Sequence, residues 1–179
     1  MPKPNEGACE SAGSLDASRP GLGTFTAQSS IEIAAPAELV YDLVSNVPDL
    51  PKWAAETDRC TWLDGAEGPA VGARFRGRNS YHDRRWATTC TVTDADPGRR
   101  FGFRVQTAGF ATASWRYEIE PTETGCRVTE STLRTVPRPI ALLVNRLLLG
   151  IPDRDAHNQR NIERTLARLK EYAEAKVAH

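Results

Sequence analysis

The sequence predicts an α+β domain in which a seven-stranded antiparallel sheet wraps around one long C-terminal helix, with two short helices after the first strand. Five alternating segments between Val71 and Val136 are joined by short turns, which is typical of an antiparallel meander. A long amphipathic stretch, about Asp153 to Ala175, then ends the chain. A sheet that is wet on one face must bury its other face, and this helix is the only large cover available.

The segment before the meander supplies two strands and two short helices. Thr24–Ala34 alternates weakly and predicts a strand. Pro36 suits the start of a helix with an apolar stripe, and Asn46 is placed to end it. Leu50–Ala54 predicts a second short helical turn, and Thr57–Asp64 predicts the second strand.

Residues that favour turns separate the remaining strands. The predicted turns are His82–Arg84, Asp96–Gly98, Ala108–Gly109 and Pro121–Gly125. After the meander, the apolar segment Ile140–Leu149 could be a buried elbow or a lid over a ligand, and we favour the elbow. Asp153 is a suitable N-cap for the final helix.

Composition bounds the class of protein. A chain of 179 residues predicts one domain, residues 24–177, preceded by a disordered leader at residues 1–23 that is rich in Gly, Pro, Ala and Ser. Lys plus Arg equals Asp plus Glu at 23 each, so we expect no nucleic acid as partner. We expect no metal, no cofactor, no stable membrane insertion and a cytoplasmic location, because the four cysteines form no CxxC pair and no apolar run could span a bilayer. Oligomeric state stays open.

Side chains with inward parity mix aromatic, small polar and acidic groups. Such a mixture suits a lined cavity between sheet and helix better than a solid aliphatic core. The candidate ligand-binding residues are Phe75, Asn79, Tyr81, Trp86, Thr88, Phe103, Trp115, Tyr117, Glu130, Asn158 and Ile162.

Several of these residues have a structural interpretation beside the functional one. Glu130 could contact a ligand or act as an acid or base, but a pair with Arg134 or a slip into water is favoured. Asp155 and Asn158 could gate the cavity mouth, but wet residues near the helix start are favoured. The helical projection turns His157 away from the inward face, which argues against a catalytic role.

Two further sets have open interpretations. Asn79, Tyr81 and Thr88 could orient a ligand or hydrogen-bond one another across strands, and neither interpretation is preferred. His82 lies in a turn and is expected in water. A basic patch could bind an anionic partner, although cross-strand ion pairing is favoured; its arginines are at positions 74, 76, 78, 84, 85, 99, 100 and 104.

The order of elements resembles the helix-grip fold of the START-like (SRPBCC) superfamily, and more narrowly its polyketide cyclase/dehydrase and lipid-transport group. The resemblance covers about Thr24 to Ala175 and rests on stretches such as SIEIAAPAELVYDLVSNVPDLPKW, VGARFRGRN and WRYEIEPTETGCRVTE. It implies a hydrophobic cavity between sheet and helix. It carries over no catalytic residue, because members range from ligand carriers to aromatase/cyclase enzymes and no single motif unites them.

Three functions follow as hypotheses. The first is binding of a hydrophobic or aromatic small molecule, such as a lipid, polyketide or quinone-like compound. The second is an aromatase/cyclase-type enzyme in which Tyr117, Glu130 or Asn79 polarises carbonyls and moves protons. The third is a protein-interaction scaffold. The first hypothesis is preferred, because the predicted cavity face is mixed but no acid/base set can be recognised in the sequence.

Overall fold

The computed structural model describes residues 25–107, 109–136, 151 and 153–178. The predicted leader and the segment Ile140–Leu149 lie outside these residues. The elements are β1 (Phe25–Ile33), α1 (Ala37–Ser45), η1 (Val47–Lys52), β2 (Thr57–Trp62), β3 (Arg74–Tyr81), β4 (Arg84–Asp96), β5 (Arg100–Thr107), β6 (Phe110–Thr122), β7 (Gly125–Arg134) and α3 (Arg154–Val177).

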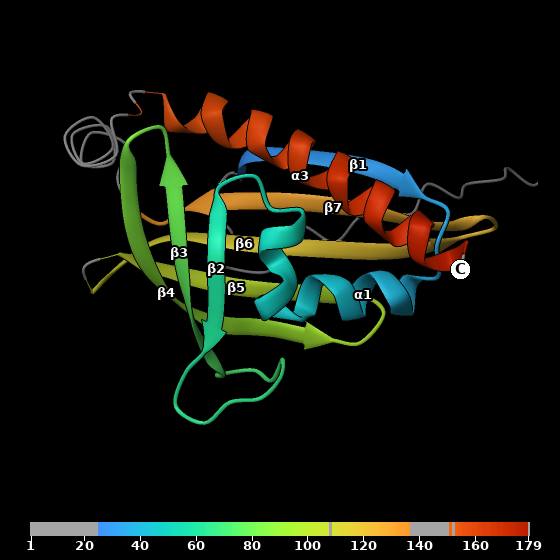
Figure 1. The fold of residues 1–179 in the computed structure, drawn as a ribbon, viewed down its shortest axis with the longest axis horizontal. Coiled ribbons are helices and arrows are strands. Elements are labelled where there is room, and N and C mark those ends of the chain that lie inside the picture. Colours follow the sequence, from blue (N-terminus) through green and yellow to red (C-terminus); the bar gives the residue numbers. More distant parts are fainter. Residues whose placement is uncertain (1–24, 108, 137–150, 152, 179) are drawn as a thin grey trace, which may run out of the picture.

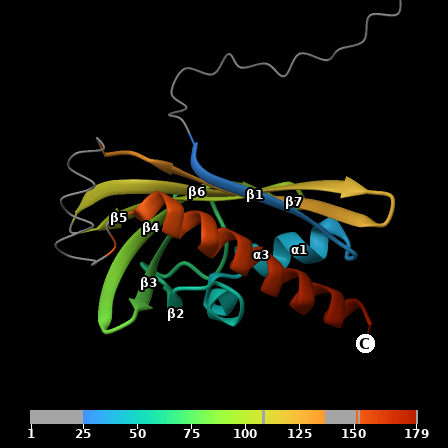
Figure 2. The same ribbon diagram turned by 90° about the horizontal axis from the view of Figure 1, so that it is seen from above.

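The predicted fold class is confirmed. One seven-stranded antiparallel sheet runs in the order β1-β7-β6-β5-β4-β3-β2, so the first two strands of the chain form its two edges. The helices α1 and η1 connect these edges and lie on the same side of the sheet as α3 (Figure 1). Seen from above, the sheet curves around this side, and α3 crosses its concave face (Figure 2). Strands, short helices and terminal helix therefore contribute to one buried core.

Apolar burial explains where α1 and η1 sit. Val40 and Val44 recur one turn apart on α1, and both are fully buried together with Val47 and Trp53. They pack in the same core cluster as Phe101 and other inward residues of β5 to β7. The short helices therefore fill one end of the concave face.

Boundaries differ from the prediction in two places. The second short helix begins at Val47 rather than at Leu50, because Pro48 is accepted in the first turn of a helix. Strand β6 continues through Pro121, which the sequence had placed in a turn. Pro121 pairs only with Cys126 of β7, since the pairing with β5 ends at Glu118, so the missing N–H breaks no ladder.

The predicted turn after Asp96 and the predicted helix ends at Asn46 and Asp153 are confirmed. Gly98 has a φ of 70°, the conformation that favours glycine in the turn after Asp96. Asp153 caps α3, because its carboxylate accepts a hydrogen bond of 3.0 Å from the Ala156 amide. Asn46 ends α1 as predicted.

The buried face of α3 is wider than the helical projection predicted, because it includes His157. The buried residues are His157, Asn158, Asn161, Ile162, Thr165, Leu166, Leu169 and Ala173. At 100° per residue these positions cover roughly half of the helix circumference. A flat sheet would bury a narrower arc, whereas the curved sheet contacts both flanks of the helix. The prediction that His157 points away from the inward face is wrong for this reason: its side chain is only 3% exposed.

Candidate functional site

The concave face of the sheet is unevenly covered. Helix α3 packs mainly along β1 and β7, and α1 with η1 fills the end near Phe101 and Ile119, both fully buried or nearly so. Phe103 contacts Phe101, with ring centroids 5.8 Å apart, and Phe103, Trp86 and Trp115 are only partly buried although their strand parity is inward. Aromatic side chains that keep accessible surface on a concave face leave room for contact with another molecule.

The Tyr117–Glu130 pair is the main polar feature of this face. The register places the two residues directly opposite each other on β6 and β7, and the Tyr117 hydroxyl donates a 2.9 Å hydrogen bond to Glu130 Oε1. Glu130 is 3% exposed, and its other oxygen, Oε2, has no hydrogen-bond partner among the described residues. The favoured structural interpretation was an ion pair with Arg134 or a register shift that exposes Glu130 to water. It is therefore wrong.

Burial decides the protonation of this pair. Desolvation raises the pKa of Glu130 to about 8, although the hydrogen bond from Tyr117 acts in the opposite direction. Desolvation, with the neighbouring carboxyl, also raises the pKa of Tyr117 well above its ordinary value. Near neutral pH, both groups are mainly uncharged. A protonated carboxyl can donate a hydrogen bond from one oxygen while it accepts one at the other.

The first turns of α3 face this region. Asn158 is buried, and its Oδ1 lacks a hydrogen-bond partner in the part of the chain that the structure describes. Asp155 binds Arg134 of β7 through a 2.6 Å contact that is also a hydrogen bond. The expectation that both residues stay wet at the helix start is therefore wrong for Asn158, whereas the Asp155 side chain stays 37% exposed. Asp155 also fixes α3 to the end of β7.

A second polar cluster anchors the opposite flank of α3. Glu56 lies in the loop between η1 and β2, and its carboxylate binds Arg154 through two hydrogen bonds, the shorter one 2.8 Å. The same carboxylate contacts His157 Nε2. We call Glu56, Arg154 and His157 the flank cluster. The sequence did not single out Glu56 or Arg154, because their partners lie about a hundred positions away.

Two predicted site residues pack against the flank cluster. The Tyr81 ring lies edge-on to the His157 ring, with centroids 4.4 Å apart. The Arg154 guanidinium lies 5.5 Å from the centroid of the Trp86 ring, within cation–π range. Tyr81 also contacts His82, which is exposed as expected. These contacts bring the β3–β4 hairpin to the start of α3.

Neutral polar residues on β3 and β4 bind one another. Thr57 Oγ1 donates to Asn79 Oδ1 at 3.2 Å, and Asn79 Nδ2 reaches Thr88 Oγ1 at 3.5 Å. The structural interpretation therefore accounts for Asn79 and Thr88. Their side chains form a hydrogen-bonded row across β2, β3 and β4.

Two other predicted site residues belong to the closed core. Phe75 is 2% exposed and packs edge-on against Phe103, with ring centroids 5.2 Å apart. Ile162 is fully buried on α3. Trp86, Phe103 and Trp115 thus keep accessible surface on the concave face, whereas Tyr117 and Glu130 lie buried on β6 and β7. Asn158 lies on α3 and Tyr81 on β3.

Two hollows lie on other parts of the protein than the space between the sheet and α3. One, of about 310 Å³, is on the outer face of the sheet, and the other, of about 220 Å³, lies between α1 and the loop before β3. Among the residues described here, no three His, Cys, Asp or Glu side chains are grouped to hold a metal. The cavity between sheet and helix stays a prediction.

Within the described ranges, no helix combines the length and the apolar character needed to cross a bilayer.

Solved structures with the same fold support the assignment of the architecture. The polyketide-cyclase-like protein Cgl2372 of Corynebacterium glutamicum is 31% identical, with a TM-score of 0.58, and the match covers 88% of this chain and 97% of that chain. Protein NE0264 of Nitrosomonas europaea is 15% identical, with a TM-score of 0.64 and coverage of 85% and 96%.

A third structure, the di-domain ARO/CYC StfQ from the steffimycin biosynthetic pathway, is 14% identical with a TM-score of 0.66. This match covers 85% of the chain and 51% of StfQ. The two matches under 25% identity show the fold alone. A search of curated proteins found no match.

The family model described as polyketide cyclase / dehydrase and lipid transport matches residues 24–174, nearly the whole predicted domain. Together with the helix-grip architecture and the relative from Corynebacterium glutamicum, this match shows that the chain belongs to the polyketide cyclase/dehydrase and lipid-transport family.

Proposed function

We propose that this protein binds a hydrophobic or aromatic small molecule with a carbonyl or hydroxyl group on the concave face between the sheet and α3. Lipids, polyketides and quinone-like compounds have this character. The observation that carries the proposal is the buried carboxyl of Glu130, which has one oxygen bonded to Tyr117 and the other without a partner among the described residues. An unpartnered buried polar atom costs free energy, and a ligand oxygen would remove that cost.

The aromatic residues nearby support an apolar body for this ligand. Phe103 and Trp115 are opposite each other on β5 and β6, and both keep accessible surface. Trp115 precedes Tyr117 by two residues, so both side chains face the concave side. A ring stacked on Trp115 would place its oxygen substituent toward Glu130. The family description and its mention of lipid transport agree with such a ligand.

Native mass spectrometry of gently purified protein tests the proposal. We expect an additional mass bound to the protein, or binding of 1,4-naphthoquinone as the probe when the purified protein is empty. Replacement of Trp115 by Ala should lower the affinity for the probe on the order of tenfold, because it removes an aromatic contact and its buried area. Trp62→Phe, at the far edge of the sheet, is the matched control. Empty protein without affinity for the probe, for lipids or for a polyphenol extract would refute the proposal.

A second candidate is an aromatase/cyclase-type enzyme, and one observation favours it. The pKa of Glu130 is raised to about 8, close to working pH, where a carboxyl can both accept and return a proton. Glu130 would move a proton at a carbon next to a carbonyl, while the Tyr117 hydroxyl positions its carboxyl. The double variant Tyr117→Phe, Glu130→Gln should lose turnover of a poly-carbonyl substrate but keep its fold. Unchanged turnover would remove this assignment.

A further inference from the structure

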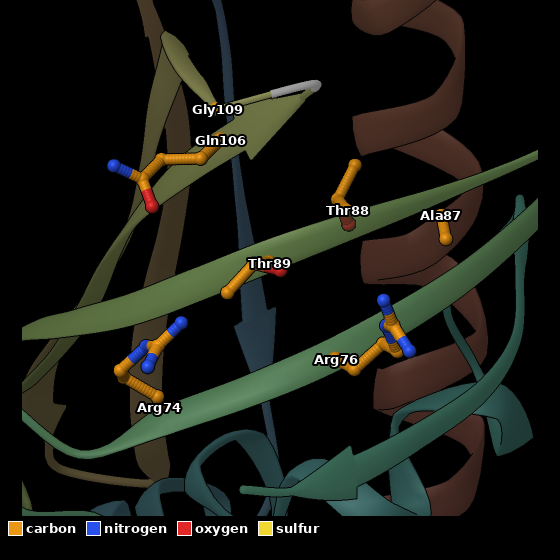
Figure 3. A pocket seen from close by; sticks show the side chains of 7 residues that line it. All are labelled: Arg74, Arg76, Ala87, Thr88, Thr89, Gln106 and Gly109. Atoms are coloured by element: carbon orange, nitrogen blue, oxygen red, sulfur yellow. The ribbon is translucent and has the colours of Figure 1, made fainter.

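The outer face of the sheet carries a hollow that has no part in the concave site. It has a volume of about 310 Å³, and its lining includes Arg74 and Arg76 of β3, Thr89 of β4 and Gln106 of β5. Figure 3 shows the two arginines on one side of Thr89 and Gln106 on the other. Arg74 and Arg76 alternate with buried Phe75 and Gly77, so their side chains lie on the face opposite to α3.

The strand register gathers positive charge around this hollow. We define the outer arginine patch as Arg59, Arg74, Arg76, Arg78 and Arg104, all of them exposed. Arg59 pairs directly opposite Arg78, a cross-strand arrangement of like charges that is destabilising on its own. Arg74 and Arg104 both flank Thr91 in one cross-strand row.

Carboxylates neutralise little of this charge. Within the described residues, one arginine of the patch forms an ion pair: Arg74 lies 2.9 Å from the Asp64 carboxylate. Asp58 accepts a hydrogen bond from Ser80 at the edge of the sheet. Elsewhere on the outer face, Asp94 of β4 forms ion pairs with Arg100 of β5 and Arg116 of β6, so the predicted cross-strand pairing is confirmed for Arg100. Arg76 and Arg78 form no ion pair with the residues described here.

The donors around the hollow suit one chemical group. Guanidinium groups present a planar fork of N–H donors that matches phosphate oxygens, and threonine hydroxyls and a glutamine amide add neutral donors. The volume lies at the lower end of the range for small-molecule sites, larger than a bare ion needs. We propose that this hollow binds the phosphate group of a small organic phosphate, with Arg76 as its main ligand and Arg74, Thr89 and Gln106 beside it.

Titration of isotope-labelled protein with inorganic phosphate, followed by amide and side-chain NMR signals at constant ionic strength, tests the site. We expect saturable shifts at Arg76, Thr89 and the Gln106 side-chain amide. Arg76→Gln should lower the affinity for phosphate on the order of tenfold, since a charge-assisted hydrogen-bond pair is lost. Arg168→Gln, an exposed arginine on α3, makes the same charge change and should leave the affinity unaltered. Equal affinities in the two variants, or shifts elsewhere in the protein, would overturn the proposal.

A vesicle arm distinguishes a soluble phosphate from a lipid headgroup. Saturable phosphate shifts without sedimentation on phosphatidic acid vesicles support a soluble organic phosphate. If the protein sediments with the vesicles, and if both Arg76→Gln and added inorganic phosphate prevent this, the site binds the phosphate group of a lipid. Vesicle binding that is equally strong in Arg76→Gln contradicts the proposal. Binding of duplex DNA without saturable NMR shifts on addition of phosphate contradicts it as well. Failure here would leave the concave-face proposal intact, because the two sites lie on opposite faces.

Discussion

Glu130 combines two properties that rarely occur together in one side chain. It is almost fully buried, and within the part of the chain that the structure describes only one of its two oxygens has a hydrogen-bond partner, the Tyr117 hydroxyl. A charged carboxylate in that position would cost several kcal/mol, so the group stays protonated to higher pH than usual. Stability and ligand chemistry therefore depend on the same proton.

The free energy of unfolding should decrease as pH rises from about 4.5 to about 8. The folded pKa of Glu130, about 8, exceeds its ordinary value of 4.5, so in this window the folded state holds a proton that the unfolded state has lost. The slope approaches roughly 1.4 kcal/mol per pH unit for one proton. Urea denaturation across this range measures it.

The variant Glu130→Gln should remove most of that slope, whereas Glu120→Gln, at an exposed position of the neighbouring strand, should keep it. A slope that survives in Glu130→Gln would mean that another group is responsible.

Replacement of Tyr117 by Phe should destabilise the protein by about 1–3 kcal/mol, because a buried carboxyl oxygen loses its hydrogen bond. It should also raise the pKa of Glu130 further, since the lost hydrogen bond lowers that pKa. The control Tyr41→Phe removes another buried hydroxyl and should leave the pH profile unchanged. Urea denaturation curves of both variants at several pH values compare their pH profiles. Identical pH profiles for Tyr117→Phe and the wild type would contradict the assigned contact.

The sequence predicted the inward side chains of the sheet well but not their partners. Strand parity alone placed Trp115, Tyr117 and Glu130 on the concave face. The contact between Glu56 and His157 depends on how far the sheet curls over α3, and hydrophobic periodicity does not encode that curvature. Buried polar residues at positions 157, 161 and 165 repeat every four residues, and that spacing was the available signal.

At the level of elements, α3 is fixed on two sides. The Arg134–Asp155 contact joins it to β7, and the flank cluster joins it to the loop before β2. The two anchors act on the first turns of the helix, while Leu166 and Leu169 are fully buried further along. Polar contacts therefore determine the position of the half of α3 that borders the accessible part of the concave face.

Glu56→Gln should loosen that half of α3. The change removes the negative charge that binds Arg154 and His157, both largely buried, and should cost about 1–3 kcal/mol. Hydrogen exchange should become faster at the first two turns of α3 and stay slow at Leu166 and beyond. Glu171→Gln, exposed on the same helix, is the control. Uniform acceleration along α3 would contradict a local anchor.

The β6–β7 turn meets the end of β1 at Gly125. A Cβ at this position would lie 2.8 Å from the Ala35 amide nitrogen and closer still to the Ile33 carbonyl oxygen. Both neighbours are backbone atoms, which cannot rotate away. Gly125→Ala should therefore destabilise the protein by several kcal/mol in thermal denaturation. Gly109→Ala, in another turn with open space around it, should cost less. Equal losses of stability in the two variants would show that the backbone conformation of the glycine, rather than contact with the end of β1, causes the destabilisation.

At the level of the whole molecule, the fold was predictable because its strands are consecutive hairpins with clear turns. Among the strands that the structure describes, the pairing of β1 with β7 is the non-local one, and no local signal specifies it. The order of elements and the long terminal helix were sufficient to indicate the architecture. The accessible end of the concave face depends on side-chain packing across several strands, which a single sequence does not reveal.

Three thiols report on the integrity of the whole domain. Cys60, Cys90 and Cys126 are free and buried, and desolvation raises the pKa to about 12 for Cys60 and Cys90 and to about 11 for Cys126. In a Cys9→Ser background, these thiols should resist iodoacetamide until the domain unfolds. Mass spectrometry of labelled protein should show all three modified together as urea increases. Rapid labelling of one thiol in the native protein would reveal a local opening.

The arrangement of the sheet edges also has a consequence for biosynthesis. Ser30 and Thr129 are neighbours in the finished sheet but lie 99 positions apart in the chain. During translation, the first strand emerges early and must wait for its partner until the last strand leaves the ribosome. Throughout that interval its backbone groups are open to incorrect association, so the nascent chain depends on water, or on a chaperone, to keep β1 available.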